Sequence, residues 1–278
     1  SPIVAGAMKG DPQVKVLSAP SALYTYMGIN HEDPVLSNVK VRRAIAHAIN
    51  RDEIIKYKFD GMARPATGLL APGHWAYEGD VERYEFNPGK AMALLDEAGF
   101  ADPDGPGPQK RFTVTYKTST NKFRLGVARA MASMLEAVGI GVKLRSYEFG
   151  TLFDDIRSGN FQLFTMQWNE TVEPDLFRWI FHSKSIPASA TGQGGSTGAN
   201  RGRYRNPEMD ALLDEGRVEP DVAKRRAIYQ KVQKIAASDL PYISLWHEDN
   251  IVISAPGVSG YTIAPQAGFE GLTGVSCR

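Results

Sequence analysis

The chain has 278 residues, enough to bury a sizeable core and to form either two lobes or one large α/β domain. Hydrophobic residues make up 42% and charged residues 23%, as in ordinary soluble proteins, and a formal net charge of +1 provides no overall field for nucleic acid or an anionic membrane. Cys277 is the only cysteine, which excludes an internal disulfide and a zinc site built from several cysteines.

Long apolar runs and the pattern of the first residues are the sequence features that would indicate a membrane span or a signal peptide. No apolar run approaches the roughly 18–20 residues that span a bilayer. The first residues, Ser-Pro-Ile-Val-Ala-Gly, lack an initiator methionine and the basic, apolar and small-residue layout of a signal peptide. We therefore expect that something upstream of this chain was lost, by processing or by the choice of segment.

The first half of the chain alternates helical and strand patterns, which is typical of α/β proteins. Apolar residues recur at helical spacing over residues 39–59, and Ser37 or Asn38 is available as the N-cap. A second helix is predicted to begin at the Asn-Pro pair 87–88, a cap followed by a first-turn proline, and to end at Gly99. A turn, a strand, a helix and a further strand are predicted next, at residues 101–110, 112–116, 123–138 and 142–147.

The second half continues the alternation and adds one long irregular segment. Residues 183–205 are rich in Gly, Ser, Thr and Ala with little periodicity, so they are predicted to form a long loop, either functional or disordered. Helices are predicted at residues 152–157, from the Asn-Pro pair 206–207, and at 220–238, with strands at 161–168, 240–246 and 251–254.

The segment 161–177 carries the clearest signal of a binding site. An apolar, β-prone run ends in Trp168 and gives way to Asn169, Glu170 and a proline. A buried strand that stops in this way delivers Trp168 and Glu170 to its exit, where a cleft wall would need them. A flat aromatic face beside a carboxylate suits a ligand with a cationic group. The alternative is a buried strand whose acidic turn only caps the next helix.

Several segments, in this order, resemble the extracytoplasmic solute-binding proteins of peptide-type ABC importers, the dipeptide and oligopeptide binders. The resemblance implies an α/β, periplasmic-binding-protein-like lobe with a mixed central sheet flanked by helices, hinge strands and a C-terminal piece of the other lobe. It covers about the C-terminal half of a typical member. The matching segments are residues 38–54 (Asn38-Val-Lys-Val-Arg-Arg-Ala-Ile), 87–100 (Asn87-Pro-Gly-Lys-Ala), 135–142, 168–175, 204–213, 225–229 and 240–245.

By this resemblance, residues 1–18 are a hinge remnant of lobe one, residues 19–247 are ligand-binding lobe two, and residues 248–278 return through the hinge to lobe one. The implied function is peptide transport: the chain is a fragment of a periplasmic or extracytoplasmic transport protein that binds a peptide or a related small solute between two lobes. The implied partners are this ligand, a membrane permease that holds the receptor at the membrane, and the missing N-terminal half. Neither a cofactor nor catalysis is implied.

The resemblance also implies which residues contact the ligand. Members of the family place ligand contacts in the segment of Trp168 and Asn169, followed by an aspartate three positions after the tryptophan that pairs with the ligand's α-ammonium. Here Glu170 comes two positions after Trp168, and its longer side chain can still reach an ammonium. Asn200 is expected near the ligand on a flap, although residues 200–205 can equally be a solvated loop.

A second group of site residues follows the strand at 112–116. Dipeptide binders carry an arginine and a tyrosine here for the ligand's carboxylate, and the corresponding positions are Thr118 and Thr120. Because threonine cannot form the bidentate charged pair of arginine, strict dipeptide specificity is disfavoured. Thr118 and Asn121 are predicted to supply polar contacts, and the cations that can replace the arginine are Lys117, Lys122 and Arg124.

Other functions are weaker alternatives. A hydrolase or transferase using Glu148, Glu170 or Glu173 needs a second catalytic group, which the sequence does not show, and a fragment that binds nothing by itself is the remaining possibility. The basic run 200–205 does not indicate nucleic acid, because no recognised motif accompanies it. The histidines lack metal-site spacing, and His47 is expected to be structural. Residues 246–249 are interpreted as hinge packing, with cleft contact the minority option.

Overall fold

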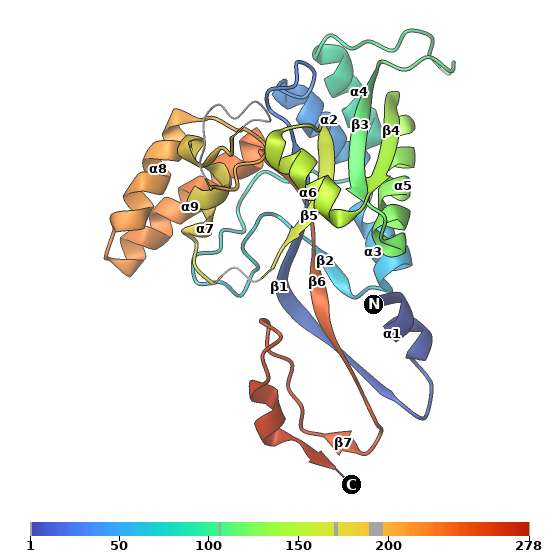
Figure 1. Ribbon diagram of the computed structural model, residues 1–278, viewed down its shortest axis with the longest axis vertical. Helices are drawn as coiled ribbons and strands as arrows, with labels where there is room; N and C mark the ends of the chain where they lie inside the picture. The colour runs from blue at the N-terminus through green and yellow to red at the C-terminus, as the bar shows by residue number, and fades with distance from the viewer. Residues whose placement is uncertain (1, 106, 170–171, 189–196, 278) are drawn as a thin grey trace.

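A six-stranded mixed sheet lies at the centre of the protein and carries helices on both faces (Figure 1). The computed structural model describes residues 2–105, 107–169, 172–188 and 197–277. The strand order is β2-β6-β1-β5-β3-β4, in which β1 is antiparallel to β5 and β6, β2 is antiparallel to β6, and β3 is parallel to β4 and β5. The strands are β1 (Lys15–Ile29), β2 (Ala63–Pro65), β3 (Phe112–Ser119), β4 (Ile140–Tyr147), β5 (Leu163–Trp168) and β6 (Tyr242–Ser254). This architecture confirms the predicted fold class.

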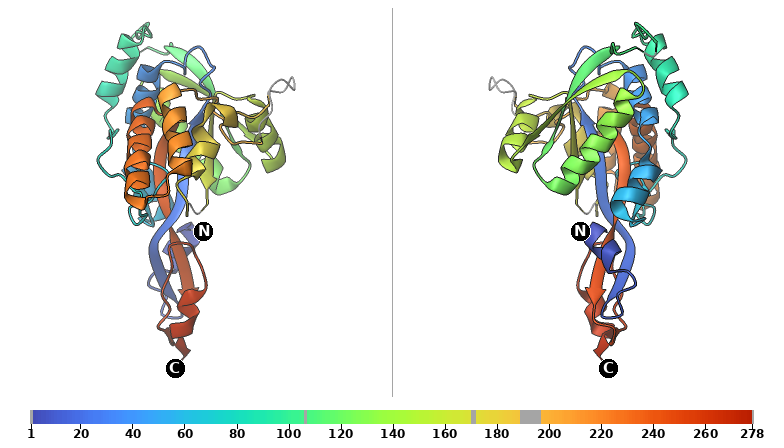
Figure 2. Two further views of the ribbon diagram at one scale, coloured as in Figure 1. Left: turned by 90° about the vertical axis from the view of Figure 1, so that its left-hand side faces the viewer. Right: turned by 90° about the vertical axis from the view of Figure 1, so that its right-hand side faces the viewer.

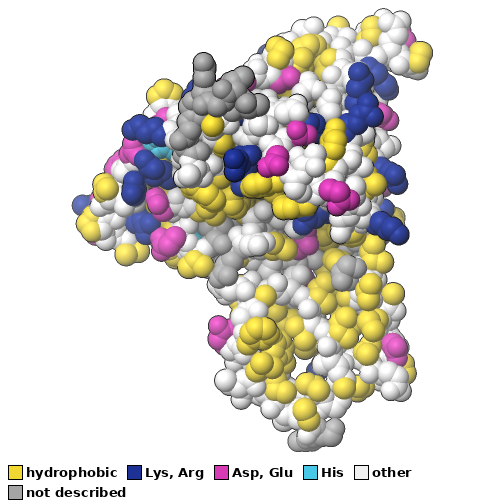
Figure 3. Space-filling model, viewed as in Figure 1, with side chains coloured by type: hydrophobic (Ala, Val, Ile, Leu, Met, Phe, Trp, Pro, Cys, Tyr) yellow, Lys and Arg dark blue, Asp and Glu magenta, His cyan; other side chains and the backbone are white. Residues whose placement is uncertain are grey.

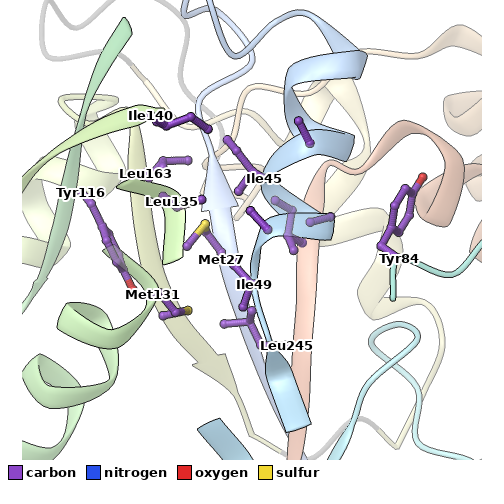
Figure 4. Packing of buried hydrophobic residues seen from close by; sticks show 14 of the residues in the cluster. Met27, Ile45, Ile49, Tyr84, Tyr116, Met131, Leu135, Ile140, Leu163 and Leu245 are labelled. Atoms are coloured by element: carbon purple, nitrogen blue, oxygen red, sulfur yellow. The ribbon is translucent and has the colours of Figure 1, made fainter. Parts of the chain in front are cut away.

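The helices divide between the two faces of the sheet. On one face α2 (Val39–Ala48), α3 (Arg51–Phe59), α4 (Pro88–Glu97) and α5 (Lys122–Glu136) contribute to a first core. On the other, α6 (Phe149–Ser158), α7 (Leu176–Phe181), α8 (Pro207–Val218) and α9 (Val222–Asp239) contribute to a second. Figure 4 shows the first core, where Met27 of β1 lies among aliphatic side chains that include Ile45, Leu135 and Leu163.

Asparagine caps begin several helices where the sequence predicted them. The side chains of Asn38, Asn87 and Asn206 each accept hydrogen bonds from backbone N–H groups two or three residues ahead, which would otherwise lack a partner in the first helical turn. Asn38, rather than Ser37, is the cap of α2.

Three predicted elements, one helix and two strands, were wrong in their boundaries. The helix expected over residues 39–59 is two helices, because Ile49 is extended and the side chain of Asn50 accepts a hydrogen bond from the N–H of Glu53, starting α3 anew. The strands expected at residues 240–246 and 251–254 are one continuous strand, β6, whose later residues pair with the first residues of β1.

A two-stranded stalk, made of residues 15–20 and 249–254, extends from the sheet (Figure 2). Lys15 pairs with Ser254 and Pro20 with Asp249, and an irregularity between Pro20 and Tyr24 separates this ribbon from the six-stranded sheet. Beside it lie the short helix α1 (Pro2–Met8), in the segment expected to contain hinge strands, and the chain end with β7 (Val258–Ser259), the 3₁₀-helix Glu270–Gly274 and β8 (Ser276–Cys277).

Candidate functional site

The candidate site lies where the carboxyl ends of β3 and β5 approach the base of the stalk. Neighbouring side chains on a strand point to opposite faces of the sheet, so the end of β5 divides its residues between two environments. Gln167 faces the side covered by α3 and α5, whereas Trp168 packs with the second core on the opposite side.

A cavity of about 230 Å³ opens on the α3 and α5 side, and we call it the stalk cavity. Its walls come from β1, β3, β5 and β6 and from the helices α1, α3 and α5, so distant parts of the sequence meet there. Aromatic and aliphatic walls are formed by Phe59, Phe123, Val127 and Trp246. The polar groups are contributed by Thr25, Thr118, Asn121, Arg124, Thr165, Gln167 and Glu248.

Glu248 is the acidic group of the stalk cavity and the residue directly before the stalk. Its carboxylate accepts hydrogen bonds from the hydroxyl of Thr25, at 3.0 Å, and from the side-chain amide of Gln167. Gln167 in turn accepts a hydrogen bond from the guanidinium of Arg124 at 2.9 Å. Burial raises the pKa of the Glu248 carboxyl above its usual value, and these polar neighbours offset only part of that effect.

Two of the predicted site residues, Thr118 and Asn121, line the stalk cavity together. Thr118 is buried at the end of β3. Asn121 caps α5 by accepting a hydrogen bond from the N–H of Arg124 at 3.1 Å. Thr120, which the resemblance placed beside them, donates to Glu148 at 2.9 Å.

The three cations considered for a ligand carboxylate are placed differently. Lys117 is buried away from the stalk cavity, where its ammonium is 2.7 Å from the carboxylate of Asp155 and 2.5 Å from the carbonyl of Asn160. Lys122 is exposed at the start of α5, and Arg124 lines the cavity. Of the three, Arg124 is therefore the cation available in the cavity.

Trp168 belongs to an aromatic cluster on the opposite face of the sheet. Its ring stacks on Tyr26 with centroids 6.4 Å apart and meets Trp179 edge-on at 5.6 Å. The guanidinium of Arg201 lies 5.2 Å from the Trp168 ring and 4.9 Å from that of Phe153. The aromatic surface that was expected to be open to a ligand cation thus already has an internal cation beside it.

The remaining predicted site residues lie elsewhere. Asn169 is exposed just after β5, and Glu170 falls outside the described residues. Asn200 is only 1% exposed, and its amide donates to the carbonyls of Phe181, His182 and Tyr204. Its oxygen also accepts from the N–H of Tyr204 at 3.0 Å, so this side chain braces the loop ahead of α8.

Sequence reasoning missed Thr25 and Gln167, and it gave Glu248 mainly a packing role. The alternation along β5 and β6 is the signal that could have separated Gln167 from Trp168 and Glu248 from His247. What the sequence could not supply is the register that brings these strands together, since Thr25 and Glu248 are 223 residues apart.

A larger cavity of about 500 Å³ is bounded by residues 65–69, 81–86 and the end of α9, and it contains none of the predicted site residues. In the part of the chain that the structure describes, no cluster of three His, Cys, Asp or Glu side chains is arranged to hold a metal ion. His47 has a structural contact, a 2.7 Å hydrogen bond to the carbonyl of Glu85. Among the described helices, none combines the length and apolarity needed to cross a bilayer.

These observations fit a solute-binding fold, and comparison with known proteins gives the class. Residues 2–187 match the profile "Bacterial extracellular solute-binding proteins, family 5 Middle", and the chain belongs to this family. The resemblance to the binding proteins of peptide-type ABC importers is thereby confirmed.

Named relatives narrow the comparison further. The chain is 29% identical to the oligopeptide-binding protein AppA of Bacillus subtilis over 262 residues, covering 91% of this chain and 46% of the relative. It is 29% identical to the dipeptide-binding protein of Escherichia coli over 265 residues, covering 93% and 46% respectively. The solved structure of AppA in complex with a nonapeptide superposes with a TM-score of 0.80 and 27% identity, covering 98% of this chain and 54% of that one. The chain thus spans about half the length of the curated relatives it matches.

Proposed function

We propose that this chain forms one ligand-binding lobe of the solute-binding component of an ABC importer, taking up a peptide or a related small solute between itself and a second lobe. The observation that carries the proposal is the stalk cavity, where four strands and the start of α5 place polar groups at the base of the stalk. Ligand pockets combine apolar walls with a few polar groups in this way. The oligopeptide- and dipeptide-binding relatives favour a peptide as the solute.

The surface around the stalk supports a missing second lobe. Apolar side chains are exposed on α1, on the stalk and near the chain end, and Figure 3 shows them gathered on the lower part of the molecule. Exposed apolar surface of this kind marks a protein interface. The N-terminal half of a longer receptor is the partner that we propose for it. The side chains are Ile3, Val4, Ile253, Phe269 and Leu272.

Closure of the two lobes about the stalk would bury the solute and exclude water without changing it chemically. In this proposal the closed receptor works outside the cytoplasm and delivers its solute to a membrane permease. Thr118 and Asn121 contact the solute from the stalk cavity. Contacts from Trp168, Asn169, Glu170 and Asn200 belong to the same proposal, and Trp168 lies on the opposite side of the sheet from the stalk cavity.

A hydrolase or transferase finds less support. The carboxylates of Glu148 and Glu173 bond to Thr120 and to Arg225, the latter at 2.9 Å, and these pairings do not form a nucleophile with a base in the described residues. The proposal allows that this lobe does not bind solute by itself, because one half of a cleft lacks the solute contacts that the other half provides.

Titration calorimetry with trialanine and pentaalanine tests the proposal, using the complete receptor and this chain in parallel. The complete receptor is expected to bind at least one peptide, this chain to bind it far more weakly, and mass spectrometry to recover the peptide intact. Cleavage of the peptide would favour the hydrolase. Equal affinity of the chain and the receptor would contradict a site shared between two lobes.

A further inference from the structure

Glu248 is a carboxylate that forms no direct ion pair with the described residues, although the guanidinium of Arg124 in the same cavity lowers its pKa somewhat. It is partly buried in β6 and lines the stalk cavity, and both groups that donate to it, the hydroxyl of Thr25 and the amide of Gln167, are neutral. Among the residues that the structure describes, none forms an ion pair with it. Arg124, the cation of the cavity, bonds instead to Gln167 at 2.9 Å.

This arrangement leaves a negative charge that the protein stabilises poorly. A carboxylate removed from water needs hydrogen bonds and an opposite charge close by, and here the charge of Arg124 acts without direct contact and does not outweigh burial. The raised pKa of Glu248 has burial as its largest cause, which agrees with this deficit. A cationic group that enters the cavity would complete the pair.

From this geometry we infer that the stalk cavity is a subsite for a positively charged group of the solute, an ammonium or a guanidinium, and that Glu248 is its anchor. This inference rests on the proposed function, and it places charge recognition on the face of the sheet opposite to Trp168.

The walls of the stalk cavity suit such a group. Phe59 lies edge-on to Phe123, with ring centroids 5.1 Å apart, and tilted against Trp246, also at 5.1 Å. Aromatic rings attract cations through their faces and accommodate the methylene groups that carry them. At about 230 Å³ the cavity is smaller than the ~300–1,000 Å³ pockets that enclose drug-sized ligands. It therefore has room for one terminus or one side chain, and the rest of a peptide would lie outside it.

The variant Glu248→Gln in the complete receptor tests the role of the charge. The amide keeps an oxygen that accepts from Thr25 and Gln167 and removes only the negative charge. Suitable probes are the peptide Ala-Lys-Ala, with two ammonium groups, and its N-acetylated norleucine analogue, with none. The matched control is Glu97→Gln. Glu97 is an exposed carboxylate of α4 that pairs with Lys40 of α2.

We expect Glu248→Gln to weaken binding of Ala-Lys-Ala by about tenfold or more and to change binding of the analogue without ammonium groups by less than about twofold. Glu248→Asp, which keeps the charge, should lose less, and Glu97→Gln should change neither affinity. Equal losses for both probes, or no loss for Ala-Lys-Ala, would overturn the inference and leave the proposed function standing. If the unaltered receptor binds neither probe while its melting curve is normal, peptide binding itself fails, and the inference fails with it.

Discussion

His247 provides a pH-dependent test of how tightly the end of the sheet is packed. His247 is 6% exposed, and its ring lies 5.5 Å from that of Tyr24. Burial lowers the pKa of His247 from 6.5 to about 4, because the charged form would lose its hydration there. The folded protein therefore holds this histidine neutral at pH values where the unfolded chain already binds a proton.

The direction of the pH dependence follows from how many protons the folded and the unfolded protein bind at His247. Above pH 6.5 both states are neutral at His247 and the residue gives no pH dependence. As the pH falls from 6.5 towards 4, only the unfolded chain takes up the proton, so the free energy of unfolding decreases. The full difference between the two pKa values corresponds to about 3 kcal/mol. About 2 kcal/mol of it should be lost by pH 5.

Urea unfolding of the chain and of a His247→Phe variant, at about pH 7 and about pH 5, measures this contribution. Phenylalanine keeps a ring against Tyr24 and cannot titrate. The loss of stability between the two pH values should be about 2 kcal/mol smaller in the variant. The variant should still lose some stability between the two pH values, because burial also lowers the pKa of His31, to about 3. Identical pH dependence in both proteins would refute the buried, neutral state of His247.

Two further substitutions separate structural roles from binding. Lys117→Met should lower the free energy of unfolding by about 2 kcal/mol or more, because it leaves Asp155 without its partner at 2.7 Å, whereas solute affinity of the complete receptor should be unchanged. If Lys117→Met lowered solute affinity while stability stayed normal, Lys117 would be a ligand-binding residue rather than a structural one. Gly28→Ala should also cost about 2 kcal/mol or more, since a Cβ atom there would lie 2.2 Å from the ring of the fully buried Phe164. Gly68→Ala, which meets open space, should change stability by less than about 0.5 kcal/mol in the same urea titration.

The sequence predicted most helices and strands because their signals are local. Asparagine caps and apolar periodicity need only a few neighbouring residues, and they identified the starts of α4 and α8. The break between α2 and α3 was not predicted, because both helices bury apolar residues in the same core and the periodic pattern therefore continues across Ile49. The missed signal was the Asn-x-x-Glu pattern, in which Asn50 accepts from the N–H of Glu53 and donates to its carboxylate at 3.2 Å.

The site was less predictable because it depends on the pairing of distant strands. Thr118 and Asn121 were predicted from the resemblance to dipeptide binders, at the end of one strand and the start of the next helix, and both line the stalk cavity. The face on which Trp168 lies depends on the pairing of β5 with Tyr24 and its neighbours in β1. A shift of one residue in that pairing would exchange Trp168 and Gln167 between the two faces of the sheet. Residue types alone therefore could not place the indole away from the cavity.

Both faces at the end of this sheet carry charged groups. On one, Glu248 lines a cavity together with Arg124, and on the other the guanidinium of Arg201 lies near the rings of Phe153 and Trp168. Neither Glu248 nor Arg201 forms an ion pair within the described residues. A fold selected only for stability would pair such groups or replace them with apolar ones, since isolated charges away from water are costly. Retaining both reduces stability and keeps two opposite charges available at the edge where a second lobe and a solute would meet. This is the physical arrangement expected of a binding surface that is complete only after closure.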